Sequence, residues 1–269
     1  RLFPTADITA ESLGEDGAVY LHIFNPLPFD REDVLVCDLD LPDGFGRFVS
    51  EPFYGEKIIG FRIFDADGKE IPYTVEAVRQ NVRKRVSAKK LTVVHVHRVS
   101  LRARLLAAGT TVLRVVPVSG RVHCLDFLST GQLRAENEHL SLSICRDGTF
   151  DVLDKITGTA YRGFNRFVSD TDTGDGWFRD MPVSGTAFHT CGDCRGIEVE
   201  ERSCVRTVFK ITQALTLPEE QIWEGNINET YGGLRPSTVQ KDLLIHTHVS
   251  IERGGRFLRL RVEVENNVR

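Results

Sequence analysis

Apolar and polar residues alternate with a period of two along most of this chain, which is typical of β-strands with one buried face. The clearest example is the run over 257–265 near the C-terminal end, where Leu and Val alternate with Arg and Glu from Leu258 onward. Gly254-Gly255 separates this run from a second alternating run over 239–251. The two runs predict a β-hairpin that has one apolar and one charged face.

Further strands are predicted where such runs are bounded by Gly, Pro, Asn or Asp. They lie over 19–25, 33–39, 59–64, 70–78, 91–101 and 110–118, and then over 139–145, 149–154, 164–169, 196–201 and 203–217. The one helix-like start is Pro218–Gln221, where Pro and acids precede Gly225. Because sheets with one polar face pack in pairs to bury the other face, the pattern predicts an all-β fold of antiparallel β-sandwiches.

The alternation weakens over 117–132, where small residues gather. We therefore predict a small β-sandwich domain over 1–120, a linker over 121–135 and the first part of a larger sandwich over 136–269. The chain has no initiator Met and stops just after a strand-like run. We interpret it as a truncated piece of a longer polypeptide.

Composition excludes several classes of protein. Hydrophobic residues make up 41% and charged residues 27%, as in globular proteins, and the net charge is -4. The one basic cluster, Arg79–Lys90, is short and interrupted, so no nucleic-acid partner is predicted. No apolar run could span a bilayer, and the first residues do not resemble a signal peptide. With six mostly separated cysteines, these features predict a cytoplasmic protein with reduced thiols and no membrane partner.

An acidic, glycine-containing segment is the most polar candidate site. It carries Asp170, Asp172 and Asp175 and ends on Trp177 and Phe178. Its carboxylates could supply a general acid and a base or a calcium cage, but a solvated loop is the favoured interpretation. Large aromatic rings beside carboxylates are, however, a combination that sugar sites often use.

Three motifs have residue types that bind metals. Cys191 and Cys194, preceded by His189, form half of a zinc knuckle, which Cys204 could help to complete. A turn with two thiols or a local disulfide are the alternatives. The pairs His95 with His97 and His246 with His248 each lie on one strand face. Half-buried packing is favoured for the first pair and a solvated sheet face for the second. Neither a glycine-rich phosphate loop nor a Gly-x-Ser-x-Gly motif is present.

A series of short motifs resembles, in order and spacing, the C-terminal β-domains of glycoside hydrolase family 38 α-mannosidases. The motifs are Asn137-Glu138, Asp147-Gly148-Thr149, Asp154-Lys155, Gly158, Tyr161-Arg162-Gly163 and Gly174-Asp175 with Trp177. Phe24–Phe29 is similar to the start of the family's first β-domain, and Val264–Asn267 to a strand end in its large sandwich. The resemblance spans nearly the whole chain.

The resemblance implies a small sandwich followed by part of a galactose-mutarotase-like super-sandwich. It also implies a catalytic domain that lies N-terminal to these β-domains in the same polypeptide. In that family a zinc ion bound by His and Asp assists a carboxylate nucleophile that attacks α-mannosides with retention. No catalytic residue and no zinc ligand of that domain lies in this chain, so the chain alone is expected to be inactive. A homo-oligomeric parent enzyme remains open.

The same resemblance gives the acidic aromatic loop a role, because the corresponding loop of relatives approaches the active site. It implies that Asp175, Trp177 and Phe178 bind the substrate. Relatives commonly have Tyr where Trp177 stands and a second aromatic where Arg179 stands, so an indole N–H would replace a phenol as donor. The alternative function is a stand-alone carbohydrate-binding or interaction module, in which Trp177 and Phe178 stack on a sugar.

Overall fold

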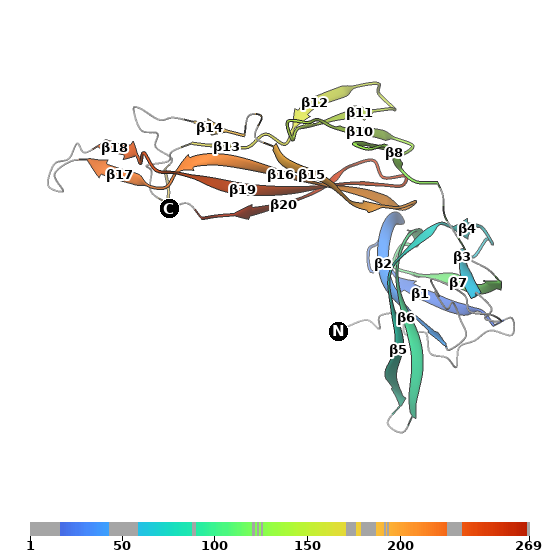
Figure 1. Ribbon diagram of the computed structural model, residues 1–269. Coiled ribbons are helices and arrows are strands. Elements are labelled where there is room, and N and C mark those ends of the chain that lie inside the picture. Colours follow the sequence, from blue (N-terminus) through green and yellow to red (C-terminus); the bar gives the residue numbers. More distant parts are fainter. Residues whose placement is uncertain are drawn as a thin grey trace, which may run out of the picture. The chain divides into compact units, whose positions relative to one another are not determined.

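The computed structural model describes residues 17–42, 59–87, 90–119, 122, 124, 126–170, 176–178, 187–190, 192, 194–224 and 233–267. Every regular element in these ranges is a β-strand, and every strand pair is antiparallel (Figure 1). The predicted all-β class is therefore confirmed. No helix long and apolar enough to cross a membrane occurs in the described part of the chain.

The chain divides into two compact units, which we call unit 1 and unit 2. Unit 1 comprises residues 1–127 together with 203–205. A sheet of order β1-β7-β3-β4 and a sheet of order β2-β6-β5 form it. The strands are β1 (Val19–Phe24), β2 (Arg31–Pro42), β3 (Ile59–Phe64), β4 (Glu70–Ile71), β5 (Tyr73–Ser87), β6 (Lys90–Leu105) and β7 (Thr110–Ser119).

Alternate residues of these strands form one apolar cluster in unit 1. Leu21, Phe61, Leu101 and Leu113 are at most 1% exposed and pack together in it. Tyr73 stacks on Phe61 with ring centroids 4.7 Å apart, and burial raises the pKa of its hydroxyl. This packing explains the period-two pattern of the first half of the sequence.

Asn25, within the Phe24–Phe29 motif, holds the turn after β1. Its side chain is buried, and its amide donates to the carbonyl oxygens of Phe29 and Leu106, each at 3.0 Å. Its carbonyl oxygen accepts a hydrogen bond from the backbone N–H of Leu27 at 3.2 Å. The motif residue therefore satisfies backbone groups of two turns, which is a structural role.

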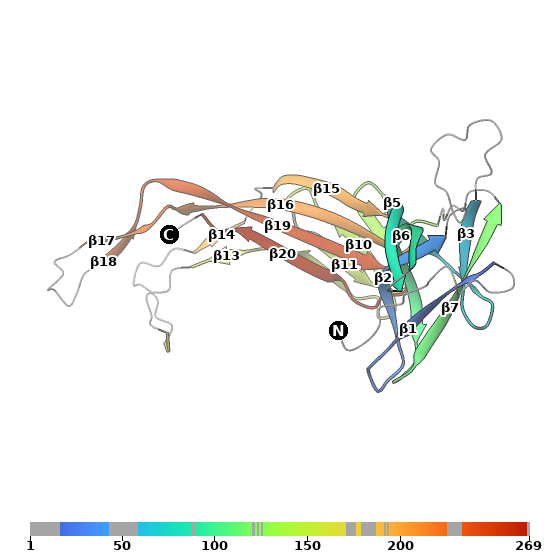
Figure 2. The same cartoon turned by 90° about the horizontal axis from the view of Figure 1, so that it is seen from below.

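Unit 2 comprises residues 128–202 and 206–269. Its sheets have the orders β12-β11-β10-β9-β8 and β15-β16-β19-β20, with the short pairs β13-β14 and β17-β18 (Figure 2). The strands are β8 (Ser129–Gly131), β9 (Arg134–Glu136), β10 (Leu140–Ile144), β11 (Phe150–Asp154), β12 (Ala160–Phe164), β13 (Val168–Ser169), β14 (Phe188–His189), β15 (Cys194–Arg202), β16 (Arg206–Pro218), β17 (Gln221–Glu224), β18 (Gly233–Pro236), β19 (Gln240–Glu252) and β20 (Arg259–Glu265).

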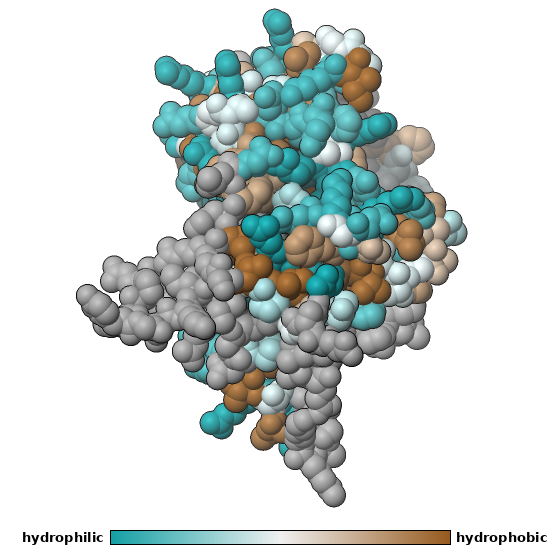
Figure 3. Space-filling model, turned by 90° about the vertical axis from the view of Figure 1, so that its right-hand side faces the viewer, coloured by the Kyte–Doolittle hydropathy of each residue, from teal (hydrophilic) through white to brown (hydrophobic). Residues whose placement is uncertain are grey.

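The two larger sheets of unit 2 bury their apolar faces against each other. Leu142 and Phe150 from the first sheet belong to the same buried cluster as Phe209 and Val249 from the second. The opposite face of the second sheet carries charged residues. On the molecular face seen in Figure 3, hydrophilic side chains likewise cover much of the described surface, with smaller apolar areas between them.

Three stretches differ from the sequence expectations. The strand predicted over 164–169 is divided, because β12 ends at Phe164 and the two-residue β13 begins only at Val168. Pro218–Gln221 does not start a helix: Pro218 ends β16 and Gln221 begins β17, while the backbone N–H of Glu219 donates to the carbonyl of Val239 at 2.8 Å. The long antiparallel pair thus continues into a second hairpin. Residues 129–136, mostly inside the stretch expected to be a linker, form β8 and β9. The predicted domain boundaries themselves remain a prediction.

The C-terminal hairpin is confirmed as β19 and β20, with Val262 opposite Thr247. Thr247 and its neighbours on that face of β19 are buried. Leu260, Val262 and Val264 lie on the same face but are 54%, 44% and 50% exposed. Strand β20 is at the edge of its sheet, so its apolar row is only partly covered.

Candidate functional site

The motif residue Asn137 joins the start of β10 to the turn between β19 and β20. It is 6% exposed, and its amide donates to the carbonyl oxygens of Glu252 at 2.6 Å and Gly255 at 2.8 Å. Its carbonyl oxygen accepts from the backbone N–H groups of His139 at 2.9 Å and Leu140 at 2.7 Å. All the polar groups of this side chain are used to hold the fold.

The next motif, Asp147-Gly148-Thr149, forms the turn between β10 and β11. Asp147 Oδ1 accepts from the hydroxyl of Thr149 at 2.7 Å and from its backbone N–H at 3.0 Å. These hydrogen bonds, the hydroxyl first, lower the pKa of Asp147, so this carboxylate is an acceptor at neutral pH. Gly148 has φ +84, which a residue with a Cβ adopts only with strain.

A polar network beneath this turn connects it to the second sheet. Gln213 of β16 is fully buried, and its Oε1 accepts from the amide of Asn165 at 3.1 Å. The same amide donates to the carbonyl of Gly148 at 2.9 Å, and Asn165 Oδ1 accepts from Thr247 at 2.8 Å. The sequence analysis missed this network, although a Gln inside the apolar run of β16 was a signal for it.

The motif Asp154-Lys155 has a similar structural role. Asp154 accepts from the backbone N–H of Ile156 at 2.8 Å and from the hydroxyl of Thr157 at 2.9 Å, and these bonds lower its pKa. Lys155 Nζ donates to the carbonyl of Asn137 at 2.7 Å and lies 2.9 Å from a carboxylate oxygen of Glu136. These motif residues therefore close turns of the first sheet.

Two of the three residues predicted to bind substrate can be placed. Trp177 is 88% exposed and Phe178 is 76% exposed, whereas Asp175 lies outside the described residues. Large rings with this exposure can stack on a sugar ring or pack against another protein surface. The structure does not test which of these contacts they make, and the substrate-binding role stays a prediction.

The candidate metal motifs do not gather into one centre within the described ranges. No group of three or more His, Cys, Asp or Glu side chains there is placed to hold a metal ion. Cys191 and Asp193 lie outside these ranges, and Cys194 is half-buried at the start of β15. His95 and His97 are more deeply buried than expected, with His97 edge-on to the ring of Phe61.

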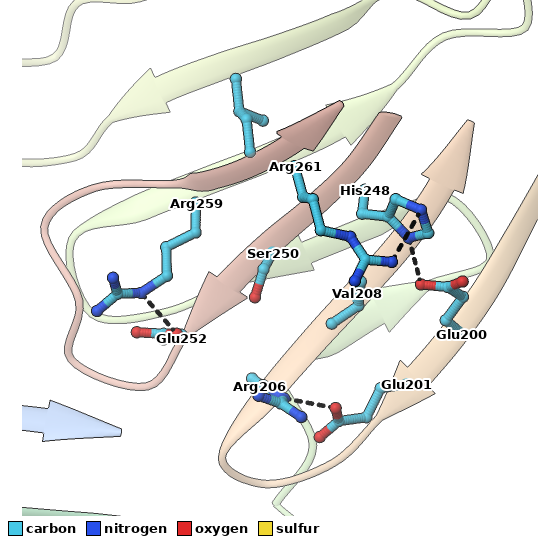
Figure 4. A pocket seen from close by; sticks show the side chains of 10 residues that line it. Glu200, Glu201, Arg206, Val208, His248, Ser250, Glu252, Arg259 and Arg261 are labelled. Carbon is cyan, nitrogen blue, oxygen red and sulfur yellow. Dashed lines mark hydrogen bonds and ion pairs between the residues drawn. The ribbon is translucent and has the colours of Figure 1, made fainter. Parts of the chain in front are cut away.

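The charged face of the second sheet contains an open pocket of about 490 Å³ (Figure 4). It is formed by four adjacent strands, β15, β16, β19 and β20, and its lining residues are Glu200, Glu201, Arg206, Val208, His248, Ser250, Glu252, Arg259, Leu260 and Arg261. Sequence analysis did not find it, because its residues come from separate strands. Its local signals were the Arg and Glu residues that alternate with apolar residues over 259–265 and the histidine pair that includes His248.

His248 lies among charged groups in this pocket rather than on a solvated face. It is 8% exposed, and its Nδ1 lies 2.7 Å from a carboxylate oxygen of Glu200. Its Nε2 lies 3.4 Å from a guanidinium nitrogen of Arg261, which can only donate. These contacts allow Nδ1–H to donate to Glu200 and Nε2 to face the guanidinium of Arg261, while a carboxylate oxygen of Glu263 lies 3.8 Å from Nε2.

The remaining charges of the pocket are also paired. Arg206 contacts Glu201, and Arg259 lies 3.0 Å from Glu252 (Figure 4). Because each guanidinium faces a carboxylate, the pocket does not have the excess positive charge that a phosphate site needs. It offers mixed donors and acceptors on the surface of a rigid sheet.

Comparisons with known proteins relate the chain to glycosidases. No protein-family model matches it. A protein from Halalkalibacterium halodurans described as a putative mannosylglycerate hydrolase is 24% identical over 140 residues, which are 50% of this chain and 16% of that protein.

Two solved structures from Enterococcus faecalis share the fold over almost the whole chain. A protein in glycosyl hydrolase family 38 matches with a TM-score of 0.72 and 17% identity, covering 98% of this chain and 33% of the other. An α-mannosidase matches with a TM-score of 0.67 and 17% identity, covering 97% and 31%. The chain thus spans about a third of each solved structure, and the resemblance in fold to family 38 α-mannosidases that the motifs predicted is confirmed.

Proposed function

We propose that this chain is a non-catalytic β-region of a zinc-dependent, retaining α-mannosidase that hydrolyses terminal α-mannosides. The observation that carries the proposal is the coverage of the fold matches: nearly all of this chain corresponds to only about a third of each relative. The other two thirds of such a protein have room for a catalytic domain. The description of the curated relative as a mannosylglycerate hydrolase supports a mannosyl compound as the substrate class.

The side chains of this chain support a structural role for it and a separate catalytic domain. The motif residues Asn25, Asn137, Asp147 and Asp154 hold turns. Retaining hydrolysis needs two carboxyl groups about 5–5.5 Å apart across the sugar, one as nucleophile and one as acid and base. No group of three or more potential metal ligands lies together in the described ranges. We assign zinc and both catalytic carboxylates to the N-terminal catalytic domain of the same polypeptide.

The proposal predicts where activity resides. The isolated 269-residue chain should not hydrolyse an aryl α-mannoside, with or without added zinc, whereas the complete encoded polypeptide should. Release of the aryl group, followed by absorbance, measures both. Turnover by the isolated chain would contradict the proposal. An inactive complete polypeptide, together with binding of mannosides by the isolated chain, would favour the carbohydrate-binding module instead.

A second prediction concerns the exposed ring of Trp177, which we propose contacts the substrate or the catalytic domain next to it. Trp177→Ala in the complete enzyme should raise KM or lower kcat severalfold, because a stacking surface and an indole donor are lost. Ile156→Ala, which also truncates an exposed large side chain, is the matched control and should leave both constants unchanged. If Trp177→Ala has the same KM and kcat as the wild type, Trp177 does not contact the substrate or the adjacent part of the catalytic domain.

A further inference from the structure

The segment that carries Trp177 and Phe178 leaves and rejoins unit 2 at a short two-stranded stem. Strands β13 and β14 form this stem and pair over only two residues each (Figure 1). Trp177 and Phe178 lie between the two strands in the sequence, so the chain connects both rings to unit 2 through the stem. A two-stranded ladder alone is marginally stable. The groups that attach the stem to unit 2 are therefore important for where this segment begins and ends.

Thr190 closes the base of this stem. Because Val168 lies opposite His189, the same register places Phe167 opposite Thr190. The backbone N–H of Thr190 donates to the carbonyl of Phe167 at 3.0 Å, as in a regular antiparallel pair. In the other direction, the N–H of Phe167 donates to the hydroxyl oxygen of Thr190 at 2.9 Å. The Thr190 side chain, which is 4% exposed, thus supplies an acceptor that in a regular pair is a backbone carbonyl.

Two aromatic side chains attach the stem to the second sheet. Phe167 precedes β13 and Phe188 belongs to β14, so there is one on each side of the stem. Both pack against a small apolar cluster of β16 and β19. The buried members of this cluster are Leu215, Leu217 and Ile245. The pair of Phe167 with Thr190 therefore joins the stem to its point of attachment.

The outgoing side of the stem is held a second time, two residues before Phe167. Asn165 has φ +72, and its amide donates to the carbonyl of Gly148 and to Gln213. Its Oδ1 accepts from the hydroxyl of Thr247. On the returning side, the printed hydrogen bonds of Thr190 to Phe167 are the comparable link. Both sides of the stem are thus fixed to the buried part of unit 2 by polar side chains.

From this arrangement we infer that Thr190 is a positioning residue for the contact proposed for Trp177. Its hydroxyl keeps Phe167 in register with Thr190 and so sets the direction in which the chain leaves the second sheet toward Trp177. Thr190 itself does not touch the substrate and acts through Trp177. The inference rests on the proposed function, because it needs Trp177 to contact the substrate or the catalytic domain.

Replacing Thr190 by valine isolates the hydroxyl. Valine has nearly the same shape, so the packing around the buried side chain is kept, but it has no acceptor for the N–H of Phe167. A donor left without its acceptor in a part-buried site is costly, and the backbone relieves this cost by turning the N–H toward water. Phe167 would then leave its register with Thr190.

The experiment measures KM and kcat of the complete encoded polypeptide with an aryl α-mannoside. Thr190→Val should lower kcat/KM severalfold and change the same constant, KM or kcat, as Trp177→Ala. Thr190→Ser keeps the hydroxyl and should have wild-type kinetics. When Trp177→Ala is already present, Thr190→Val should change kcat/KM by less than about twofold, because a positioning residue acts through the ring that has been removed.

Thr157→Val is the matched control for the chemical change. The hydroxyl of Thr157 also accepts from a backbone N–H, that of Thr159 at 3.3 Å, but it lies in the turn between β11 and β12. This variant should leave KM and kcat unchanged.

Hydrogen exchange of the same polypeptide, measured by mass spectrometry, tests the stem without a substrate. The backbone amides of Ser169 and Phe188, which pair in the stem, should exchange severalfold faster in Thr190→Val than in the wild type. In Thr190→Ser and Thr157→Val they should exchange at the wild-type rate.

The outcomes separate this inference from the proposed function. If Trp177→Ala itself has wild-type kinetics, the proposed contact of Trp177 fails and the inference falls with it. If Trp177→Ala is impaired but Thr190→Val is not, only the positioning role is wrong. Equal losses from Thr190→Val with and without Trp177, equal losses in Thr190→Ser and Thr190→Val, or unchanged exchange in the stem would also overturn the inference.

Discussion

Replacing Asn137 by alanine is expected to lower the free energy of unfolding of unit 2 by about 3–5 kcal/mol. The side chain makes four hydrogen bonds, two as donor to the carbonyls of Glu252 and Gly255 and two as acceptor from the N–H groups of His139 and Leu140. Each bond contributes about 1 kcal/mol, and partners left buried without a replacement add a desolvation cost. Truncation also separates the start of β10 from the turn after β19.

Urea denaturation followed by the circular dichroism of the β-sheets measures this effect. Asn267→Ala is the control, since it removes one exposed hydrogen bond to the carbonyl of Asp242 and should change stability by less than about 0.5 kcal/mol. Asn137→Asp keeps the acceptor oxygen but loses both donors, because an ionised carboxylate only accepts, and should also destabilise unit 2. If the urea midpoint of Asn137→Ala equals that of the control variant, the side chain of Asn137 does not stabilise unit 2 as we predict.

Gly148→Ala is expected to destabilise unit 2 by about 2–5 kcal/mol, for two separate reasons. The backbone φ of +84 strains any residue that has a Cβ, which costs about 1–2 kcal/mol. In addition, a Cβ at this position would lie 2.8 Å from Nε2 and 2.9 Å from Cγ of Gln213. Gln213 is fully buried and hydrogen-bonded to Asn165, so it cannot move aside without breaking the network.

Gly158→Ala separates the two causes. Gly158 has φ +72, but no atom lies within 4 Å of the position of its Cβ. It should therefore show only the backbone strain of about 1–2 kcal/mol. The same circular dichroism measurement in urea compares the two variants. Equal losses at 148 and 158 would show that contact with Gln213 adds nothing.

These two predictions bear on what the family motifs mean in this chain. Asn137, Gly148 and Asp154 determine how turns close and how the sheets of unit 2 are joined. Motifs that consist of such residues indicate a shared fold, because the residues close turns and join sheets. This explains why the fold matches extend over nearly the whole chain, although the sequence identity is only 17%.

Much of the fold could be predicted because its signals are local. Alternating residues and a Gly or Asp turn identify β10 with β11 and β19 with β20, since strand period and turn geometry depend on neighbours in sequence. The prediction was wrong at Pro218–Gln221, where the partner of β17 lies at 233–236 and distant pairing outweighs a weak helix start. Strands β8 and β9 were missed because each has only three residues.

The candidate sites also differ in whether their residues are neighbours in sequence. The acidic aromatic loop was identified from neighbouring residues, and Trp177 and Phe178 are indeed exposed. The charged pocket could not be identified, because Glu200, Arg206, His248 and Arg261 belong to four strands whose register brings them together. The interactions of His248 likewise depend on pairing with strands far away in the sequence.

By itself the sequence determined the all-β class, most of the longer strands and the turns that join β10 to β11 and β19 to β20, since these properties follow from residues a few positions apart. Only the tertiary structure decided that Asn137 and Gln213 form hydrogen bonds between distant segments of unit 2. It also decided that a pocket of paired charges forms and that the apolar row of β20 is partly exposed. The physical reason is that burial and hydrogen bonding depend on which strands pack and pair, and those strands are distant along the chain.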